Sequence, residues 1–192
     1  MICAAGFAPT YVPSDDRRLA EAVDYLGTRA LVAAAEGASL RGRFVLVSSL
    51  GVNATASSAS ARLLDSSLGN VLAQKLAAEA YLRRRGGSLD WCIVRPGLLL
   101  KDREQGGLLL GPEDRWTGAD ADADREGLGP PVKCQSPFLA SSGAVCAATR
   151  RQVASVCVEA LEGARYSRRV VEVVARPEVP SGQARLVGTY TE

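Results

Sequence analysis

The sequence predicts an α/β fold, in which helices flank a parallel sheet, and two observations lead to this prediction. Over residues 1–96, short apolar runs alternate with longer segments in which apolar residues recur every three or four positions. The short runs are typical of strands buried on both faces, and the longer spacing is typical of amphipathic helices. Strands that alternate with helices in this way form a parallel sheet with right-handed crossovers.

The elements of this first half are bounded by glycines and prolines. The chain opens with ICAA before Gly6, which predicts a short buried strand that ends in a tight turn. Gly86 and Gly87 end the second helix, and Pro96 closes the third strand. In order, we expect a strand at 2–5, a helix at about 14–36, a strand at 44–50, a Ser/Ala/Asn-rich loop to about 68, a helix at 70–85 and a strand at 89–96.

The second half is less regular. Residues 108–116 hold a short apolar run and a turn, and residues 117–145 interrupt the pattern as an insert. A third helix is expected at 152–161 and a final strand at 169–175. We therefore predict one partial domain over residues 1–176, followed by a loose tail over 177–192 that carries proline and glycine.

Composition excludes several classes of function. The net charge is +2 and no basic run of five residues occurs, so nucleic acid is not an expected partner. No apolar stretch approaches the roughly 20 residues of a transmembrane helix, and no secretory signal opens the chain. Cys3, Cys92 and Cys157 lie in apolar runs and are expected to be buried thiols, as in a reducing compartment.

The chain contains no histidine, which excludes a Ser–His–Asp triad, a Cys–His pair and His-ligated zinc within it. Acid–base chemistry would have to use Lys, Tyr, Asp, Glu or Cys. The acidic run from Asp120 resembles a calcium loop only superficially, because Arg125 and Pro131 occupy the positions that require Gly and Glu. No metal site is predicted.

The carboxyl ends of parallel strands meet at one edge of a sheet, where ligands bind. Three of these ends are turns made of small residues or of residues with special backbone conformations, at Ala4–Gly6, Ser48–Ser49 and Arg95–Gly97. Ser49 is a candidate to hydrogen-bond a substrate carbonyl, and otherwise it simply ends the strand. Lys75, on the predicted second helix, either reaches toward this edge or is a solvated lysine. Together the turns predict a groove for a flat ligand.

These segments resemble the later two-thirds of an atypical short-chain dehydrogenase/reductase, in the NAD(P)H-binding group that includes plant and algal plastid proteins. The resemblance implies a Rossmann-like sheet flanked by helices. The residues that carry the resemblance are ICAAG (2–6), AVDYLGTRALVAAA (22–35), VLVSSLG (45–51), GNVLAQKLAAEAYL (69–82), LDWCIVRPGLL (89–99), LLLGPEDRW (108–116) and RRQVASVCVEAL (150–161).

The resemblance implies roles for individual residues. Ser49 stands at the position of the family's catalytic serine, and Lys75 matches the lysine that hydrogen-bonds the nicotinamide ribose. The other implied cofactor-binding positions are Ala4, Ala5 and Gly6 beside the adenine and its ribose, Ser48 near the nicotinamide, and Pro96 and Gly97 near the carboxamide.

Three residues depart from the family pattern. Val71 stands four residues before Lys75, where the familiar reductases carry the tyrosine that donates a proton. Asp24 occupies a position where extended members often have Asn, and Gln152 one where Asp is common. Atypical members often lack the tyrosine too, so the resemblance stands but the standard mechanism does not apply.

The largest departure is at the front of the chain. The family places a strand, a glycine-rich turn, a helix and a second strand–helix unit before the strand that ICAAG resembles, on the order of 60–90 residues. That region holds the pyrophosphate on a helix N-terminus. Its absence predicts an N-terminally truncated sheet with an exposed apolar edge. The implied cofactor is NADP or NAD, and this chain alone would lack the phosphate-binding turn.

The leading interpretation is therefore an NAD(P)-binding, short-chain-dehydrogenase-like oxidoreductase. It would transfer hydride between NAD(P)H and a small carbonyl compound, and its location would be a plastid or the cytoplasm. Two alternatives stay open. One is a non-enzymatic scaffold or assembly factor with a protein partner, favoured by the missing tyrosine. The other is an inactive truncated isoform.

Overall fold

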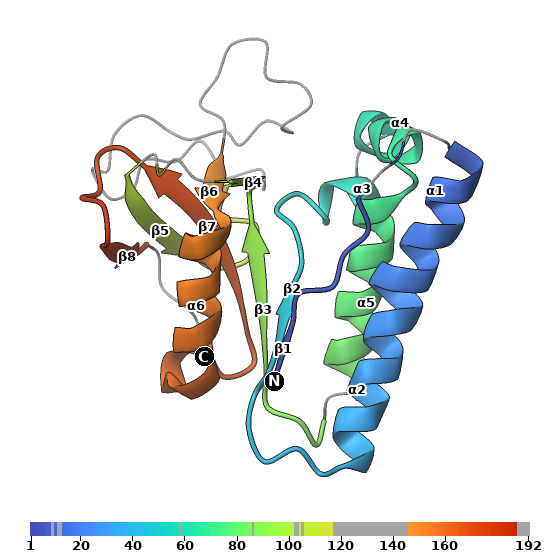
Figure 1. Ribbon diagram of the computed structural model, residues 1–192, viewed down its shortest axis with the longest axis horizontal. Helices are drawn as coiled ribbons and strands as arrows, with labels where there is room; N and C mark the ends of the chain where they lie inside the picture. Colours follow the sequence, from blue (N-terminus) through green and yellow to red (C-terminus); the bar gives the residue numbers. More distant parts are fainter. Residues whose placement is uncertain are drawn as a thin grey trace.

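The computed structural model describes most of the chain and places its strands between two groups of helices (Figure 1). The predicted insert at 117–145 lies outside the described residues. One helix, α6 (Arg150–Glu162), lies on one side of the strands, and the remaining long helices lie on the other. The described residues are 1–8, 10, 13–57, 59–85, 87–101, 104, 106–116 and 146–187.

The main sheet has six strands in the order β1-β2-β3-β7-β5-β8, and β1, β2, β3 and β7 run parallel. The parallel arrangement of the first three strands confirms the prediction. By contrast, β5 is antiparallel to β7. A separate parallel pair joins β4 to β6. The strands are β1 (Ile2–Cys3), β2 (Phe44–Val47), β3 (Trp91–Pro96), β4 (Leu98–Leu100), β5 (Gly107–Gly111), β6 (Ala147–Thr149), β7 (Arg169–Arg176) and β8 (Ala184–Leu186).

The central strands read as continuous apolar runs because both faces of the sheet are covered. Val45, Cys92 and Val94 belong to the cluster under α6, with Val153, Val156 and Cys157 of that helix. The alternate residues Phe44, Leu46 and Ile93 pack on the opposite face with Val32 and Leu82 of the other helices. Residues two apart on a strand share a face, so this alternation fixes the register of the sheet.

At one end of the described sheet, β1 pairs only with β2. Cys3 is buried beneath the helices, whereas Ile2, on the face that α6 covers further along, is 39% exposed. An apolar edge was predicted for this strand, and Ile2 confirms it for the described residues. Such an edge offers unpaired backbone groups to a further strand.

The predicted helix at 14–36 is one continuous rod with a wider turn in its middle. It comprises α1 (Pro13–Ala20), the π-helix η1 (Glu21–Gly27) and α2 (Thr28–Gly37). The rod lies beside α5 (Val71–Arg85), as Figure 1 shows. Short π-helical segments are frequent at functional sites. Here the segment carries Asp24, which is buried.

The segment expected to be a loop before α5 is instead mostly helical, so that prediction was wrong. It forms α3 (Ala54–Ser57) and α4 (Ala59–Ser67). The buried Asp65 near the end of α4 accepts hydrogen bonds from the backbone N–H groups of Leu72 and Ala73, both at 2.9 Å. This carboxylate therefore caps the N-terminus of α5 from another helix, a contact that satisfies two otherwise unpaired donors.

The tail is also more ordered than expected. β8 pairs in parallel with β5, and Val179 and Val187 are 3% and 2% exposed. The prediction of a loose tail was therefore wrong for residues 177–187. These valines pack with Leu109, Trp116 and other residues at the far end of the sheet, which supplies the burial that a free tail would lack.

The cysteines of the apolar runs are core residues. Cys3, Cys92 and Cys157 are free and buried, as predicted. Burial raises the pKa of the Cys92 thiol to about 12 and that of Cys157 to about 11, so both are unreactive thiols at neutral pH. Cys146 takes part in a disulfide, which the sequence did not predict. Among the described residues, none of the helices is both long and apolar enough to cross a bilayer.

We predict that Asp65→Ala lowers the free energy of unfolding by about 1–2 kcal/mol, because the first turn of α5 loses its cap. The control is Asp15→Ala, which removes an exposed carboxylate from the first turn of α1. It should cost less than about 0.5 kcal/mol. Urea unfolding followed by circular dichroism measures both. Equal decreases in the free energy of unfolding of the two variants would show that the cap on α5 does not stabilise the protein.

Candidate functional site

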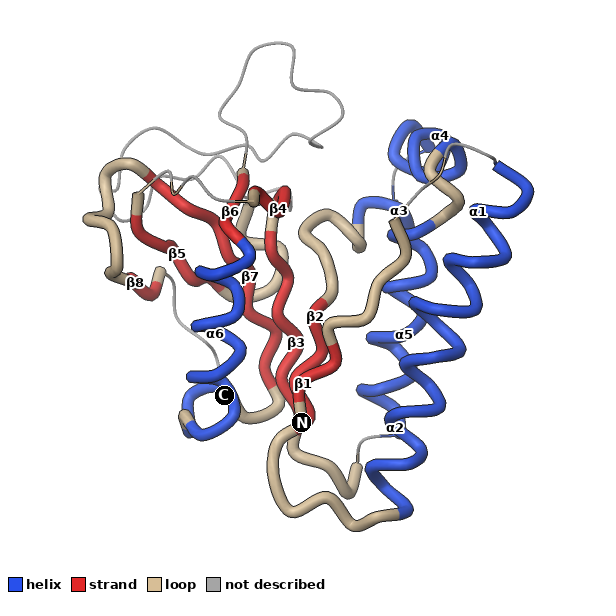
Figure 2. The backbone as a smooth tube through the Cα atoms, viewed as in Figure 1, coloured by secondary structure: helices blue, strands red, loops and turns tan. Residues whose placement is uncertain are grey.

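The candidate site lies where the parallel strands end. The loops that follow β1 and β2 leave the sheet at the same end, as Figure 2 shows. β3 runs parallel to β2 beside it, so its carboxyl end reaches this edge too. The prediction that the three turns share one edge is therefore confirmed. The side chains at this edge nevertheless divide into two groups with different environments.

The first group is built on a buried ion pair between Lys75 and Asp24. Lys75 Nζ of α5 lies 2.8 Å from Asp24 Oδ1 of the π-helix, and the two side chains are 16% and 0% exposed. The backbone N–H of Phe7 donates to Asp24 Oδ2 at 3.1 Å. Asp24 thus joins the turn after β1 to the helix that carries Lys75. Neither residue is a solvated surface charge.

The ion pair does not use all the donors of Lys75. The 2.8 Å contact with Asp24 Oδ1 engages one N–H group of the ammonium. An ammonium has three N–H groups. The geometry therefore neutralises the charge of Lys75 while leaving donors for another acceptor.

A small pocket lies beside this pair. Ser48 is 5% exposed, and its hydroxyl has no hydrogen-bond partner among the described residues. A Cβ placed on Gly6 would come within 3.3 Å of Lys75 Nζ, so the turn after β1 packs closely on the pair. Buried polar groups in proteins are nearly always satisfied, so an orphaned hydroxyl calls for an explanation. The pocket is lined by Ala5, Asp24, Thr28, Leu46, Val47, Ser48, Lys75 and Ala78.

Three other predicted site residues, Ser49, Pro96 and Gly97, are not part of this pocket lining. Ser49 Oγ donates to the carbonyl of its neighbour Leu50 at 3.3 Å, and the N–H of Leu50 donates to the Pro96 carbonyl at 2.8 Å. A Cβ on Gly97 would overlap the carbonyl of Cys146, so the protein's own backbone requires glycine there. The structure brings Ala5, Ser48 and Lys75 together, and it does not add Ser49, Pro96 or Gly97 to them.

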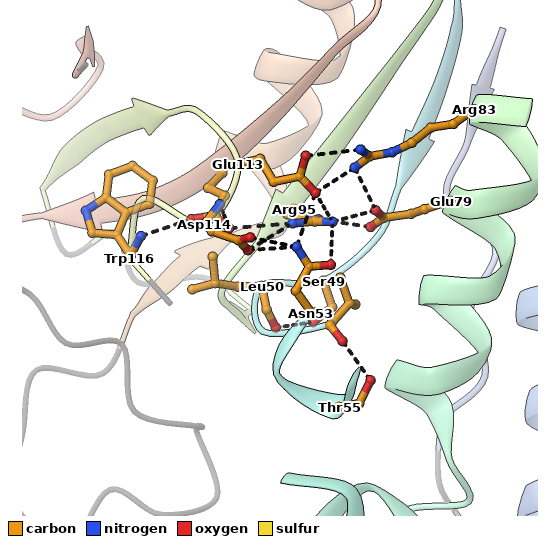
Figure 3. Close-up of polar contacts among 12 residues, drawn as sticks. Ser49, Leu50, Asn53, Thr55, Glu79, Arg83, Arg95, Glu113, Asp114 and Trp116 are labelled. Carbon is orange, nitrogen blue, oxygen red and sulfur yellow. Dashed lines mark hydrogen bonds and ion pairs between the residues drawn. The ribbon is translucent and has the colours of Figure 1, made fainter. Parts of the chain in front are cut away.

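The second group of side chains surrounds Arg95 at the end of β3 (Figure 3). Arg95 is 1% exposed. Its Nε donates to Glu79 Oε1 at 3.0 Å and its Nη2 to Glu79 Oε2 at 2.6 Å, a two-pronged contact with α5. Nη2 also donates to Glu113 Oε1 at 2.8 Å and to Asn53 Oδ1 at 3.2 Å. Burial alone would lower the pKa of Arg95, but Glu79 outweighs burial and raises it.

Glu172, in the middle of β7, completes this second group. It is fully buried, and its Oε1 lies 3.8 Å from Arg95 Nη1. Its two oxygens accept hydrogen bonds from the backbone N–H groups of Asp114 at 3.0 Å and Trp116 at 3.1 Å. Removal from water raises the pKa of Glu172 to about 7, although the two N–H groups and Arg95 oppose this.

Sequence reasoning did not predict the network around Arg95. Two of its members carried a signal, because Arg95 and Glu172 stand inside the apolar runs WCIVRP and RVVEVVA. A charge within a buried strand requires an opposite charge nearby. The sequence does not show which residues supply it, since Glu79, Glu113 and Asp114 come from other elements. A position in the middle of the helix predicts a solvated side chain for Asp24, and this prediction was wrong, because Asp24 is 2% exposed.

Comparison with known proteins agrees with this fold. Among solved structures, a Bacillus halodurans protein named as a proposed NAD-dependent epimerase/dehydratase superposes with a TM-score of 0.62 and 23% identity, over 93% of this chain and 64% of that one. A Veillonella parvula short-chain dehydrogenase/reductase in complex with NADP gives a TM-score of 0.50 and 17% identity, over 88% and 72%. At such identities these likenesses show the fold alone, which is Rossmann-like.

The family is shown by sequence. Residues 2–126 match the NAD(P)H-binding family, and the chain belongs to it. A protein of Arabidopsis thaliana described as uncharacterized and chloroplastic is 34% identical over 183 residues, which are 94% of this chain and 53% of the relative. The chain therefore spans about half the length of this curated relative.

We predict that Arg95→Met lowers the free energy of unfolding by about 3–5 kcal/mol, because the buried carboxylate of Glu79 loses its two-pronged partner and keeps only the longer 3.5 Å contact with Arg83. The control is Arg83→Met, one turn along α5 from Glu79, where a 35% exposed guanidinium is lost at a cost of about 1 kcal/mol or less. Chemical denaturation measures both. A double variant that also carries Glu79→Gln should recover part of the loss, and no recovery would contradict the pairing.

Proposed function

We propose that this chain forms part of an NAD(P)H-dependent oxidoreductase that acts on a small carbonyl compound. The observation that supports the proposal is the pocket at the strand ends. There the ammonium of Lys75 and the orphaned hydroxyl of Ser48 face a shared space beside a glycine turn. Membership of the NAD(P)H-binding family supports the choice of cofactor class.

The polar groups that line the pocket are of kinds that can bind a dinucleotide. Ribose hydroxyl oxygens accept hydrogen bonds from an ammonium, and the hydroxyl of Ser48 can both donate and accept. Asp24 holds Lys75 in place and balances its charge. The turn at Ala4–Gly6 carries no bulky side chain, which suits the flat face of an adenine ring. In this proposal Pro96 and Gly97, at the neighbouring strand end, lie beside the carboxamide group of the nicotinamide.

The bound cofactor would supply hydride, and the chain would supply orientation and hydrogen bonds. Ser49 would donate its hydroxyl hydrogen to the substrate carbonyl, which requires it to exchange its present contact with the Leu50 carbonyl. Val71, four residues before Lys75, has no proton to give. We infer that the proton comes from water or from the substrate itself.

Val71 also favours a second candidate function. A chain that keeps the cofactor pocket but lacks the tyrosine would serve as a cofactor-dependent scaffold or assembly factor. The two functions differ in turnover. A panel of quinones and small carbonyls with NADPH and NADH distinguishes them, because a scaffold binds the cofactor without oxidising it.

The proposal also covers the phosphate-binding turn and the location in the cell. No G-x-G-x-x-G sequence occurs in these 192 residues. We therefore expect that a phosphate-binding turn outside these residues is needed for tight binding. The chloroplastic relative supports a plastid location. The expected cofactor is NADP or NAD.

We predict that Lys75→Met weakens NADPH binding about tenfold, because a hydrogen bond from a charged donor is lost. Lys101→Met is the matched control, since Lys101 is exposed and distant in sequence, and it should bind as the wild type does. Cofactor fluorescence enhancement and thermal shift measure the affinity.

Wild-type affinity in Lys75→Met would show that the ribose is wrongly placed. If the unaltered chain does not bind the cofactor at millimolar concentration, the proposal is contradicted for this chain alone. The same titration on a longer protein that includes a phosphate-binding turn would then test the fold's cofactor site itself.

A further inference from the structure

The pocket at the strand ends contains an ion pair whose two charges cancel. Of the pocket-lining residues in the described part of the chain, only Asp24 and Lys75 are charged, and their side chains are 0% and 16% exposed. The next carboxylate along α5, that of Glu79, is bound to Arg95, so its charge is compensated there. A ligand that enters the pocket therefore meets a cation and an anion side by side.

The carboxylate of Asp24 is held from two directions. Its Oδ1 lies 2.8 Å from Lys75 Nζ, and its Oδ2 accepts a hydrogen bond of 3.1 Å from the backbone N–H of Phe7, in the turn after β1. The π-helical turn at Glu21–Gly27 carries this buried side chain. A rotation away from Lys75 would break contacts with two different elements. The counter-charge of Lys75 is therefore a fixed part of the pocket.

Gly6 shows how closely the turn after β1 approaches the ion pair. A Cβ placed on Gly6 would lie 3.3 Å from Lys75 Nζ and 3.5 Å from Asp24 Oδ1. Gly6 is not one of the residues with positive φ, so the glycine is needed here for space rather than for its backbone conformation. A methyl group at this position would occupy the space next to the ammonium.

Any group that binds Lys75 must lie close to Asp24 as well, because both accept hydrogen bonds from the same ammonium. The N–H groups of an ammonium diverge tetrahedrally, so two acceptors on one nitrogen lie about 4–5 Å apart. At that separation Asp24 repels an anion and offsets much of its attraction to Lys75. An uncharged acceptor escapes this repulsion and loses less hydration on burial. The charges of the pocket therefore favour an uncharged ligand group.

We propose that Asp24 is a specificity-determining residue: by neutralising Lys75 it restricts the pocket to uncharged hydrogen-bonding groups, such as hydroxyls and amides, and excludes phosphates and carboxylates. Ser48 suits the same class of ligand. Its hydroxyl is 5% exposed, has no partner among the described residues, and can both donate and accept.

The charge preference stands on the ion pair alone, but its meaning for the cofactor rests on the function proposed above. If the ligand is NAD(P)H, sugar hydroxyls enter the pocket and the phosphates lie outside it. The same rule applies to a substrate, whose anionic groups would have to point away from Lys75.

Formate and formamide test the preference, because they are similar in size and differ in charge. The lysines of the chain are Lys75, Lys101 and Lys133, so ¹³C-labelled lysine gives few NMR signals, and the signal that is absent from Lys75→Met identifies Lys75. The titrations are made at pH 7, where formate is ionised, and at constant ionic strength. The Lys75 signal of the wild type should respond at a lower concentration of formamide than of formate. A wild type that prefers formate would overturn the proposal.

Asp24→Asn removes the charge and keeps the shape, since the amide oxygen can still accept the hydrogen bond from Phe7. We expect the dissociation constant of formate, relative to that of formamide, to fall by about tenfold or more. The matched control is Asp65→Asn, at an equally buried carboxylate that caps α5 outside the pocket lining, and it should leave the ratio unchanged. An unchanged ratio in Asp24→Asn, or no response to formate, would overturn the proposal, because a merely structural aspartate does not set the charge preference.

Gly6→Ala supplies a test that does not depend on the folding of Asp24→Asn. It keeps both charges of the pocket and adds a methyl group next to the ammonium. Both probes should bind more weakly, and the ratio of their dissociation constants should stay that of the wild type. Unchanged affinities would contradict the proposal, because both probes would then bind outside this pocket.

These readouts use no cofactor, so they separate this inference from the proposed function. If Asp24→Asn switches the preference to formate and the chain does not bind NADPH, the function is contradicted for this chain alone and the role of Asp24 stands. If NADPH binds and Asp24→Asn leaves the preference unchanged, the role of Asp24 is wrong and the proposed function stands.

Discussion

One buried guanidinium, that of Arg95, joins the elements that surround the strand ends. A charge removed from water requires counter-charges and hydrogen bonds within reach, and here they come from four segments of the chain. Glu79 approaches from α5, Asn53 from the loop after β2, Glu113 and Asp114 from the turn after β5, and Glu172 from β7. The planar fork of arginine sets the directions from which these partners come. The arrangement of the loops at this edge therefore depends on satisfying a single side chain.

The second buried charge at this edge is treated differently. Lys75 is neutralised by Asp24, and this contact uses one of the three N–H groups of the ammonium. Arg95 is fully engaged by protein groups, whereas Lys75 and the hydroxyl of Ser48 keep hydrogen-bonding capacity toward the pocket. A fully satisfied network stabilises the fold, and an unsatisfied one is where a ligand gains binding energy. Because of this contrast, we propose a cofactor site at Lys75 and a structural role for the network around Arg95.

The π-helical turn positions the counter-charge of Lys75. It interrupts a rod that is otherwise α-helical from Pro13 to Gly37, and it carries Asp24 inward against α5. The carboxylate of Asp24 places a negative charge next to Lys75. Val71, one turn before Lys75 on α5, is apolar, and the chain nevertheless belongs to the NAD(P)H-binding family.

The alternation of apolar runs and amphipathic segments by itself determined the first three parallel strands, the long helices and the edge at which the turns meet. Local patterns suffice there, because burial on one or both faces leaves a periodic trace. Tertiary structure decided the helices before α5, the pairing of β8 and the antiparallel β5. Their stability comes from contacts between distant segments, such as the cap from Asp65. The partners of Arg95 and Lys75 were likewise decided only in three dimensions. A sequence shows that a buried charge needs a counter-charge, but only the packing of distant segments determines which residue provides it.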